Sequence, residues 1–421
     1  MYKKTTFKNG LRIITVPMKN TGAVTVLVLV GAGSKYETKD INGISHFLEH
    51  MFFKGTKKRP DKLTIAETLD RVGGIYNAFT GKEFTGYFAK VSAKHLDLAM
   101  DWVSDILLNS KFEKQEVEKE RGVIIEEVNM YLDTPMAYIG DLWEKLLYGD
   151  QAAGWLTIGE KEIIKKLKRE QFLSYLREHY TAQNTIVCVA GNINSRIIEE
   201  NIKDYFKNIR TISPKPKLKV IEKQIKPQCL VHFKKTDQTH LALGVRGYDL
   251  FSPKKYTQAV LTTILGGNMS SRLFMSVREE KGLAYYIKTP AETYTDTGYL
   301  VTLAGIRNDK VEEAITLILK EYKTIKNKKI NKKELKKAKD YLKGTLTLSL
   351  ESSDAQASFY TGQELLTGEI LTPEQEFKKI DQVTENDILK VAKDIFRPEK
   401  LNLALIGPFK DKERFQGLLK L

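Results

Sequence analysis

The sequence predicts an α+β protein made of two homologous domains, each a mostly antiparallel sheet packed with helices. The first observation behind this prediction is an internal repeat. The segments NTIVCVAGNI and KLNLALIGPF share one plan, and their glycines, Gly191 and Gly407, lie 216 residues apart. The second is an earlier match between VTVLVLVGAGSKYE and HLALGVRGYDLF, each followed by a helical pattern that ends on glycine, at Gly55 and Gly266, 211 residues apart. The third is the alternation of strand-like segments such as LRIITVP and YFAKVSA with helical patterns.

Because the two offsets are similar, the chain divides into two halves of about 210 residues. The predicted domains are residues 1–212 and 228–421. The linker between them, residues 213–227, begins with the proline- and lysine-containing segment SPKPKLK. With 421 residues, of which 42% are hydrophobic, the chain can bury a full core.

The N-terminal residues and the most apolar segment indicate a cytoplasmic protein without a membrane partner. MYKKTTFKNGLRIITVP starts basic but contains no apolar run typical of a secretion signal. AVTVLVLVGAG is far shorter than the roughly 20 residues of a membrane span and is typical of a buried strand. Cys188 and Cys229 both lie in strand-like segments, which fits a reducing compartment better than a disulfide framework.

The formal charge of +15 raises the question of a nucleic-acid partner. The most basic segment is KTIKNKKINKKELKKAKDYLK, residues 323–343. Within it, Leu335, Ala338 and Leu342 recur at helical spacing, so the lysines fall on the solvated face of an amphipathic helix. No nucleic-acid-binding motif accompanies them, and we therefore expect no nucleic-acid partner.

The segment ISHFLEHMFFKGT, residues 44–56, places three titratable side chains on one face of a predicted helix. His46 and His50 are four residues apart, and Glu49 follows His46 by three. Two imidazoles in this arrangement can reach one metal ion, and neutral imidazole suits Zn²⁺. The alternative is a pair of partly buried histidines that are satisfied by hydrogen bonds.

The second half of the chain provides an internal comparison for this helix. When the halves are aligned on Gly55 and Gly266, the three titratable positions correspond to Thr257, Val260 and Leu261. The fold therefore does not require titratable groups there, and the polar trio is a specific addition to the first half.

A catalytic zinc site needs a third protein ligand, and the segment QEVEKERGVIIEEVNMYL offers one. One face of its predicted helix carries Val117, Glu120, Ile124, Glu127 and Tyr131. A carboxylate on such a face costs several kcal/mol unless a cation or hydrogen bonds compensate it. We predict that Glu127 is the metal ligand, that Glu120 supports the site through a hydrogen bond, and that the neighbouring Glu126 is solvated.

These residues resemble the inverzincin metallopeptidases, the family of pitrilysin, insulin-degrading enzyme and mitochondrial processing peptidase, whose signature is H-x-x-E-H. HFLEHMFFKGT is similar to the processing-peptidase branch. Glu127, with 76 residues between it and His50, falls where the family places its distal zinc glutamate, and Glu120 falls where the family has an auxiliary one. The resemblance covers nearly the whole chain and also implies the duplicated fold.

Two further segments take their predicted roles from the resemblance alone. GGIYNAFTGKEFTGYF is similar to the family's substrate-binding edge strand, so Asn77, Ala78 and Phe79 are expected to pair with a peptide backbone. RLFMSVREEKGLAYYI is similar to the segment that carries the family's arginine and tyrosine, here Arg278 and Tyr285. The second domain is thus expected to contribute residues for substrate and transition state without binding zinc.

The predicted function is a zinc metalloendopeptidase that holds one Zn²⁺ per chain and cleaves extended, unfolded peptides or leader sequences inside a chamber. Glu49 is the expected general base toward a water that zinc makes more acidic, and Tyr285 and Arg278 are the expected donors to the oxyanion. We expect a homodimer, with a heterodimer of related chains as the alternative. The rival functions are a catalytically silent scaffold or partner subunit and simple zinc storage. Leader processing and peptide clearance both remain open.

Overall fold

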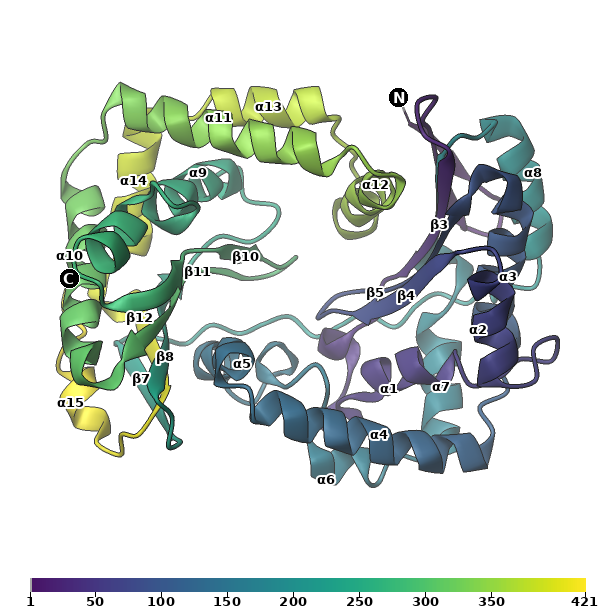
Figure 1. Ribbon diagram of the computed structural model, residues 1–421, viewed down its shortest axis with the longest axis horizontal. Helices are drawn as coiled ribbons and strands as arrows, with labels where there is room; N and C mark the ends of the chain where they lie inside the picture. Colours follow the sequence, from purple (N-terminus) through teal and green to yellow (C-terminus); the bar gives the residue numbers. More distant parts are fainter. Residues whose placement is uncertain (1) are drawn as a thin grey trace. The chain divides into compact units, whose positions relative to one another are not determined.

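The computed structural model describes residues 2–421, which form two compact units (Figure 1). Unit 1 consists of Met1–Asn129, Trp155–Leu218 and Leu348–Leu371. Unit 2 consists of Met130–Gly154, Lys219–Thr347 and Thr372–Leu421. Among the described residues, no helix is both long enough and apolar enough to cross a membrane.

Unit 1 contains a six-stranded sheet of order β1-β2-β6-β3-β5-β4. Its strands are β1 (Lys3–Thr6), β2 (Arg12–Pro17), β3 (Ala23–Val30), β4 (Ile75–Thr80), β5 (Thr85–Ser92) and β6 (Thr185–Gly191). Only β2 and β6 pair in parallel, and every other neighbouring pair is antiparallel. The central strands β3 and β6 are rich in valine and almost entirely buried, as expected for strands covered on both faces.

Unit 2 repeats this topology in a second sheet of order β10-β11-β8-β12-β7, with β9 also paired to β11. Its strands are β7 (Gln228–Phe233), β8 (Gln238–Arg246), β9 (Ala284–Lys288), β10 (Ala291–Thr293), β11 (Gly298–Arg307) and β12 (Leu401–Gly407). The single parallel pair is again the first long strand with the last, β7 with β12. The segments matched in the sequence become β6 and β12, and β3 and β8, so the predicted duplicated α+β fold is confirmed.

Helices cover both faces of each sheet (Figure 1). The helices of unit 1 are α1 (Ile44–Met51), α2 (Lys62–Asp70), α3 (Leu96–Asn109), α4 (Lys114–Leu132, whose last turn belongs to unit 2), α6 (Lys161–Ile164), α7 (Arg169–His179), α8 (Ser195–Tyr205) and α12 (Ser353–Thr367). The helices of unit 2 are α5 (Pro135–Tyr148), α9 (Lys255–Gly266), α10 (Val311–Asn327), α11 (Lys332–Ser349, whose last two residues belong to unit 1), α13 (Pro373–Asp381), α14 (Glu385–Ile395) and α15 (Lys412–Gln416).

Two helices cover the sheet of the opposite half of the sequence. Helix α12 packs on β3 and β6 of unit 1, where Ala357 and Tyr360 join the apolar cluster that contains Leu27 and Ile186. Helix α5 packs on β8 and β12 of unit 2, where Trp143 contributes to the cluster. The units therefore differ from the contiguous domains, 1–212 and 228–421, that the sequence predicts.

The physical reason for this difference is that a helix must bury its apolar face against some sheet, and the amphipathic pattern does not say which sheet. The predicted linker, residues 213–227, contains no helix or strand. The basic segment near residue 335 also folds as expected, because Leu335 and Ala338 are buried on α11.

Candidate metal centre

Helix α1 carries the three titratable residues of the motif on one side and apolar residues on the other. Phe47, Leu48 and Met51 are completely buried. The side chain of His46 is 13% exposed and that of His50 is 23% exposed, so both lie at the margin of the core rather than inside it. The apolar side fixes the rotation of the helix, and that rotation directs the two imidazoles away from the core.

Helix α4 supplies the two glutamates that the sequence singled out. Its buried positions are Val117, Glu120, Ile124 and Val128. Glu127 lies beside this buried line and its side chain is 35% exposed. The expectation that Glu127 belongs to the buried seam is therefore only partly correct. Because an α-helix has 3.6 residues per turn, the residue three turns after the buried Val117 is Val128, and Glu127 lies to one side of it.

The structure brings His46, His50 and Glu127 together. One ligand atom from each lies within 4.8 Å of the others. Nε2 of His46 is 3.7 Å from Oε1 of Glu127, and Nε2 of His50 is 3.4 Å from Oε2 of the same carboxylate. Two imidazole nitrogens and one carboxylate oxygen are the donor set of a catalytic zinc site, so the residues present fit this metal.

A second carboxylate orients one of these imidazoles. Oε1 of Glu120 lies 2.8 Å from Nδ1 of His50, which leaves the Nε2 atom of His50 to face Glu127. The other oxygen of Glu120 is 2.6 Å from Nζ of Lys54. A carboxylate on the outer nitrogen of a histidine sets its tautomer and orientation, which is the role predicted for Glu120.

The electrostatic environment shifts the pKa values of His46 and Glu120 in the directions that favour metal binding. Burial and the neighbouring His50 together lower the pKa of His46 to about 3, against a smaller opposing effect of Glu120, so His46 stays neutral at physiological pH. For Glu120, burial acts to raise the pKa, but the hydrogen bonds from His50 and Lys54 outweigh it, and the pKa is lowered. Neutral imidazole and ionised carboxylate are the ligating forms.

The carboxylate of Glu49, the third titratable residue of the motif, is bonded to strand β4. Its Oε2 accepts a hydrogen bond of 2.6 Å from the hydroxyl of Thr80, the last residue of β4. Burial raises the pKa of Glu49, while the Thr80 bond and the charge of His50 oppose that shift. A glutamate with a raised pKa beside a metal site is suited to accept and return a proton.

Strand β4, which ends beside Glu49, is an edge of the unit 1 sheet. It pairs with β5 on one side only, and Ala78, opposite Tyr87, is buried. Asn77 is exposed and Phe79 is 36% exposed. The position of Asn77, Ala78 and Phe79 on an edge strand agrees with the arrangement that peptide pairing requires.

Arg278 and Tyr285 lie in unit 2. Arg278 belongs to a π-helical turn, Phe274–Glu279, and its guanidinium stacks 4.7 Å from the ring centre of Phe274. Tyr285 is on β9 and is 77% exposed. Both side chains are accessible to a ligand, and their predicted role toward the metal centre stays a prediction.

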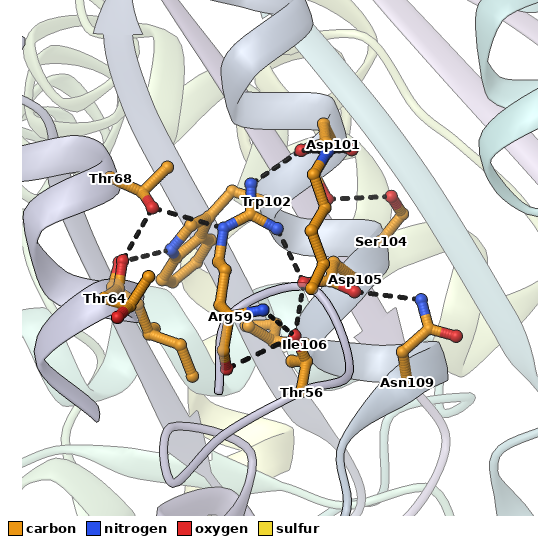
Figure 2. A network of polar contacts seen from close by, with 12 residues as sticks. Thr56, Arg59, Thr64, Thr68, Asp101, Trp102, Ser104, Asp105, Ile106 and Asn109 are labelled. Atoms are coloured by element: carbon orange, nitrogen blue, oxygen red, sulfur yellow. Dashed lines mark hydrogen bonds and ion pairs between the residues drawn. The ribbon is translucent and has the colours of Figure 1, made fainter. Parts of the chain in front are cut away.

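The chain that follows α1 is anchored to α3 by a buried polar network (Figure 2). Arg59 donates to Asp105 and to Asp101, each at 2.6 Å, and the hydroxyl of Thr56 donates to Asp105 at 2.7 Å. Asn109 completes the network by donating to the other oxygen of Asp105 at 2.9 Å. The network holds the exit of the metal-binding helix against the body of unit 1.

Three residues at the centre had no role in the sequence prediction: Lys54, which pairs with Glu120, Thr80, which bonds Glu49, and Glu37, which bonds the start of α1. Lys54 follows His50 by four residues, and that helical spacing could have suggested its place. No periodic pattern points to Thr80, whose bond to Glu49 joins two distant segments, or to Glu37, whose bonds to Gly43 and Ser45 form across the irregular turn before α1.

The matching helix of the repeat, α9, has no comparable centre. Thr257 is 7% exposed, and Val260 and Leu261 are completely buried in the apolar core of unit 2. The same helix therefore serves as core in one unit and as metal-binding element in the other.

Comparison with known proteins agrees with this picture. Residues 12–154 match the insulinase peptidases, peptidase family M16, and residues 166–342 match the peptidase M16 inactive domain. An uncharacterized zinc protease of Bacillus subtilis, YmxG, is 37% identical over 97% of this chain and 98% of its own length. An uncharacterized zinc protease of Streptomyces coelicolor is 32% identical over 98% of this chain and 90% of its own length.

Solved structures show the same fold. The crystal structure of a protease from Helicobacter pylori superposes with a TM-score of 0.90 at 25% identity, over 97% of this chain and all of that one. A peptidase M16 inactive domain from Pseudomonas fluorescens superposes with a TM-score of 0.89 at 16% identity, over 98% of this chain and 99% of that one. On both sequence and fold, the chain belongs to the insulinase-type M16 peptidase family.

Proposed function

We propose that this protein is a zinc-dependent endopeptidase that cleaves extended, unfolded peptides. The observation that carries the proposal is the convergence of His46, His50 and Glu127, with a glutamate of raised pKa, Glu49, on the same helix as the two imidazoles. Zinc storage would use the three ligands but would not need Glu49.

The metal would be held by His46, His50 and Glu127, one ion per chain. A zinc ion at this position supplies Lewis acidity, which polarises the scissile carbonyl and makes water a stronger acid. Glu49 accepts the proton of the attacking water and returns it to the leaving amine. Thr80 holds the carboxylate of Glu49 through its 2.6 Å hydrogen bond, and Glu120 holds the ring of His50.

The proposed substrate is a peptide in extended conformation, paired with β4. An edge strand offers backbone groups to any peptide that can extend, and it reads side chains only at alternate positions. Asn77, Ala78 and Phe79 would supply this pairing. The proposal covers both leader sequences and peptide fragments, because both are unfolded.

We also propose that the active unit is a homodimer. The family resemblance implies a chamber of four such domains, in which the arginine and tyrosine come from the half opposite the zinc. This chain has two such domains, so a complete chamber would need two chains. Arg278 and Tyr285 of one chain would then donate to the oxyanion at the metal centre of its partner.

The experiment is cleavage of an unfolded peptide library with mapped cut sites, by the wild type and by Glu49→Gln. We expect cleavage by the wild type that a chelator abolishes, and at least a hundredfold loss of turnover in Glu49→Gln with zinc still bound. Mapped sites would also show the sequence preference. A wild type that binds zinc and cleaves none of the library would support the rival function, a catalytically silent partner subunit.

A further inference from the structure

The first turn of the metal-binding helix α1 has an unusual start. Its N-cap residue, Gly43, has the left-handed backbone angle φ of 93° and provides no side-chain cap. The first backbone N–H groups of any helix lack partners within the helix and need acceptors from elsewhere. His46 lies in this first turn, so the position of one metal ligand depends on how the turn is held.

The acceptor is the carboxylate of Glu37. Its Oε2 accepts 2.8 Å and 3.0 Å hydrogen bonds from the backbone N–H of Gly43 and the side-chain amide of Asn42, and its Oε1 accepts a 2.9 Å bond from the backbone N–H of Ser45. Both carboxylate oxygens are therefore engaged at the start of α1, where a negative charge also interacts favourably with the helix dipole.

Glu37 is 4% exposed, and burial raises its pKa in spite of these hydrogen bonds. Burying a carboxyl group is costly, whereas an exposed serine or aspartate at the N-cap could satisfy the same N–H groups. The buried carboxyl group of Glu37 thus indicates that the start of α1 is held more rigidly than ordinary helix capping requires.

The backbone around Gly43 is equally confined. A Cβ atom at Gly43 would lie 2.7 Å from the Cα atom of Gly159 and 2.8 Å from the carbonyl oxygen of Ile158. These contacts are with backbone, which cannot yield as a flexible side chain would. The first turn of α1 is therefore fixed by Glu37 on one side and by the chain at Ile158 and Gly159 on another.

The repeat shows that the fold itself does not need this acid. At the offset of 211 that aligns α1 with α9, the residue matching Glu37 is Tyr248. Its hydroxyl donates to Asp394 on α14, and the N-cap residue of α9, Lys254, makes no side-chain cap bond. The buried carboxylate accompanies the helix that carries the metal-binding side chains and is missing from the matching position in the unit without them.

From these observations we infer that Glu37 is a positioning residue for the metal centre: it holds the first turn of α1 and thereby aims His46 at the position shared with His50 and Glu127. The inference rests on the proposed zinc function. Replacing Glu37 by glutamine would turn one acceptor oxygen into an NH₂ group that faces an N–H donor, and the turn would have to shift.

The test compares zinc affinity in Glu37→Gln and in a matched control, Glu364→Gln. The side chain of Glu364 is 2% exposed in the same unit and pairs with Lys4 and Arg12, so its replacement also removes a buried carboxylate. Zinc affinity is measured by chelator competition on folded protein. Melting temperatures are recorded with and without zinc, because a ligand that binds only the folded state raises the melting temperature.

For Glu37→Gln we expect an affinity loss of about tenfold, comparable with the loss of residues that orient a ligand, and a smaller zinc-dependent rise in melting temperature. Glu364→Gln should lower both melting temperatures equally and keep the wild-type affinity. If Glu37→Gln fails to fold, Glu37→Asp, which keeps the charge on a shorter side chain, should show an intermediate loss.

Folded Glu37→Gln, or folded Glu37→Asp where only that variant folds, with an affinity within twofold of wild type would overturn the inference about Glu37 alone. A wild type without any zinc-dependent stabilisation would overturn the zinc function and the inference together. The two failures are therefore distinguishable.

Discussion

Glu126 and Glu127 are adjacent in the sequence, yet only one of them faces the histidines. Glu127 lies within 4 Å of both His46 and His50, whereas Glu126 is exposed and accepts a 3.2 Å hydrogen bond from Asn129. Successive helical residues point about 100° apart, which explains the separation.

The first prediction concerns this pair. Glu127→Gln should weaken zinc binding by at least tenfold, because a neutral amide replaces an anionic ligand, and Glu126→Gln should leave it unchanged. Zinc titration against a competing chelator measures both. The reverse result, loss in Glu126→Gln only, would mean that the assignment on α4 is wrong by one residue.

His179, at the end of α7, links stability to pH. It is 1% exposed, packs against the rings of Tyr175 and Tyr36, and its pKa is lowered by burial to about 4. Between the unfolded pKa of about 6.5 and the folded value, the unfolded chain binds a proton that the folded chain does not. The contribution of His179 to the free energy of unfolding is therefore fully present above the unfolded pKa and is lost as the pH falls toward the folded pKa.

The second prediction follows from this direction of the pH dependence of stability. His179→Phe keeps an aromatic ring without a titratable group. Relative to this variant, the metal-free wild type should lose about 2 kcal/mol of unfolding free energy between pH 6.5 and pH 4.5. Denaturant unfolding at several pH values measures the difference. A difference in unfolding free energy between the two proteins that stays constant across this pH range would contradict the lowered pKa of His179.

At the scale of elements, sequence patterns predict what is local and miss what is not. The spacing of His46, Glu49 and His50 determines their shared face because helix geometry is local, and Glu127 could be found because it adjoins an apolar stripe. The bond between Thr80 and Glu49 joins a strand to a helix 31 positions earlier, and no periodicity encodes that approach. For the same reason, sequence patterns do not show that α5 and α12 each pack on the sheet formed by the other half of the sequence.

The third prediction uses α12. Ala357 is completely buried against the unit 1 sheet, whereas the next residue, Ser358, is exposed. Ala357→Asp would bury an unpaired charge at a cost of several kcal/mol, so unit 1 should unfold at a lower urea concentration and lose zinc affinity. Ser358→Asp is the control and should behave like the wild type.

Contiguous domains lead to a different expectation, because residue 357 would then belong to the domain without zinc. Under that arrangement, Ala357→Asp would destabilise unit 2 and spare the metal centre. Zinc titration of the variant in mild urea separates the two outcomes.

At the scale of the whole molecule, the proposed homodimer predicts complementation between inactive chains. One protein carries Glu49→Gln, and the other carries Arg278→Ala with Tyr285→Phe. In a mixed dimer, the intact centre of the second chain would meet the intact arginine and tyrosine of the first, so about one good site per mixed dimer should recover.

Native mass spectrometry must show that mixed dimers form. Mixed dimers that form and stay inactive would rule out a site shared between chains. Activity that depends instead on a different, related chain would identify the heterodimer that the sequence left open.

One zinc ion should bind between α1 and α4, and anomalous X-ray scattering at the zinc absorption edge is the most direct test of this binding. We predict a single anomalous peak per chain at about 2.0–2.2 Å from one nitrogen each of His46 and His50 and from a carboxylate oxygen of Glu127. A folded protein crystallised with zinc that shows no peak there, or shows the metal bound without one of these three side chains, would contradict a zinc centre formed by His46, His50 and Glu127.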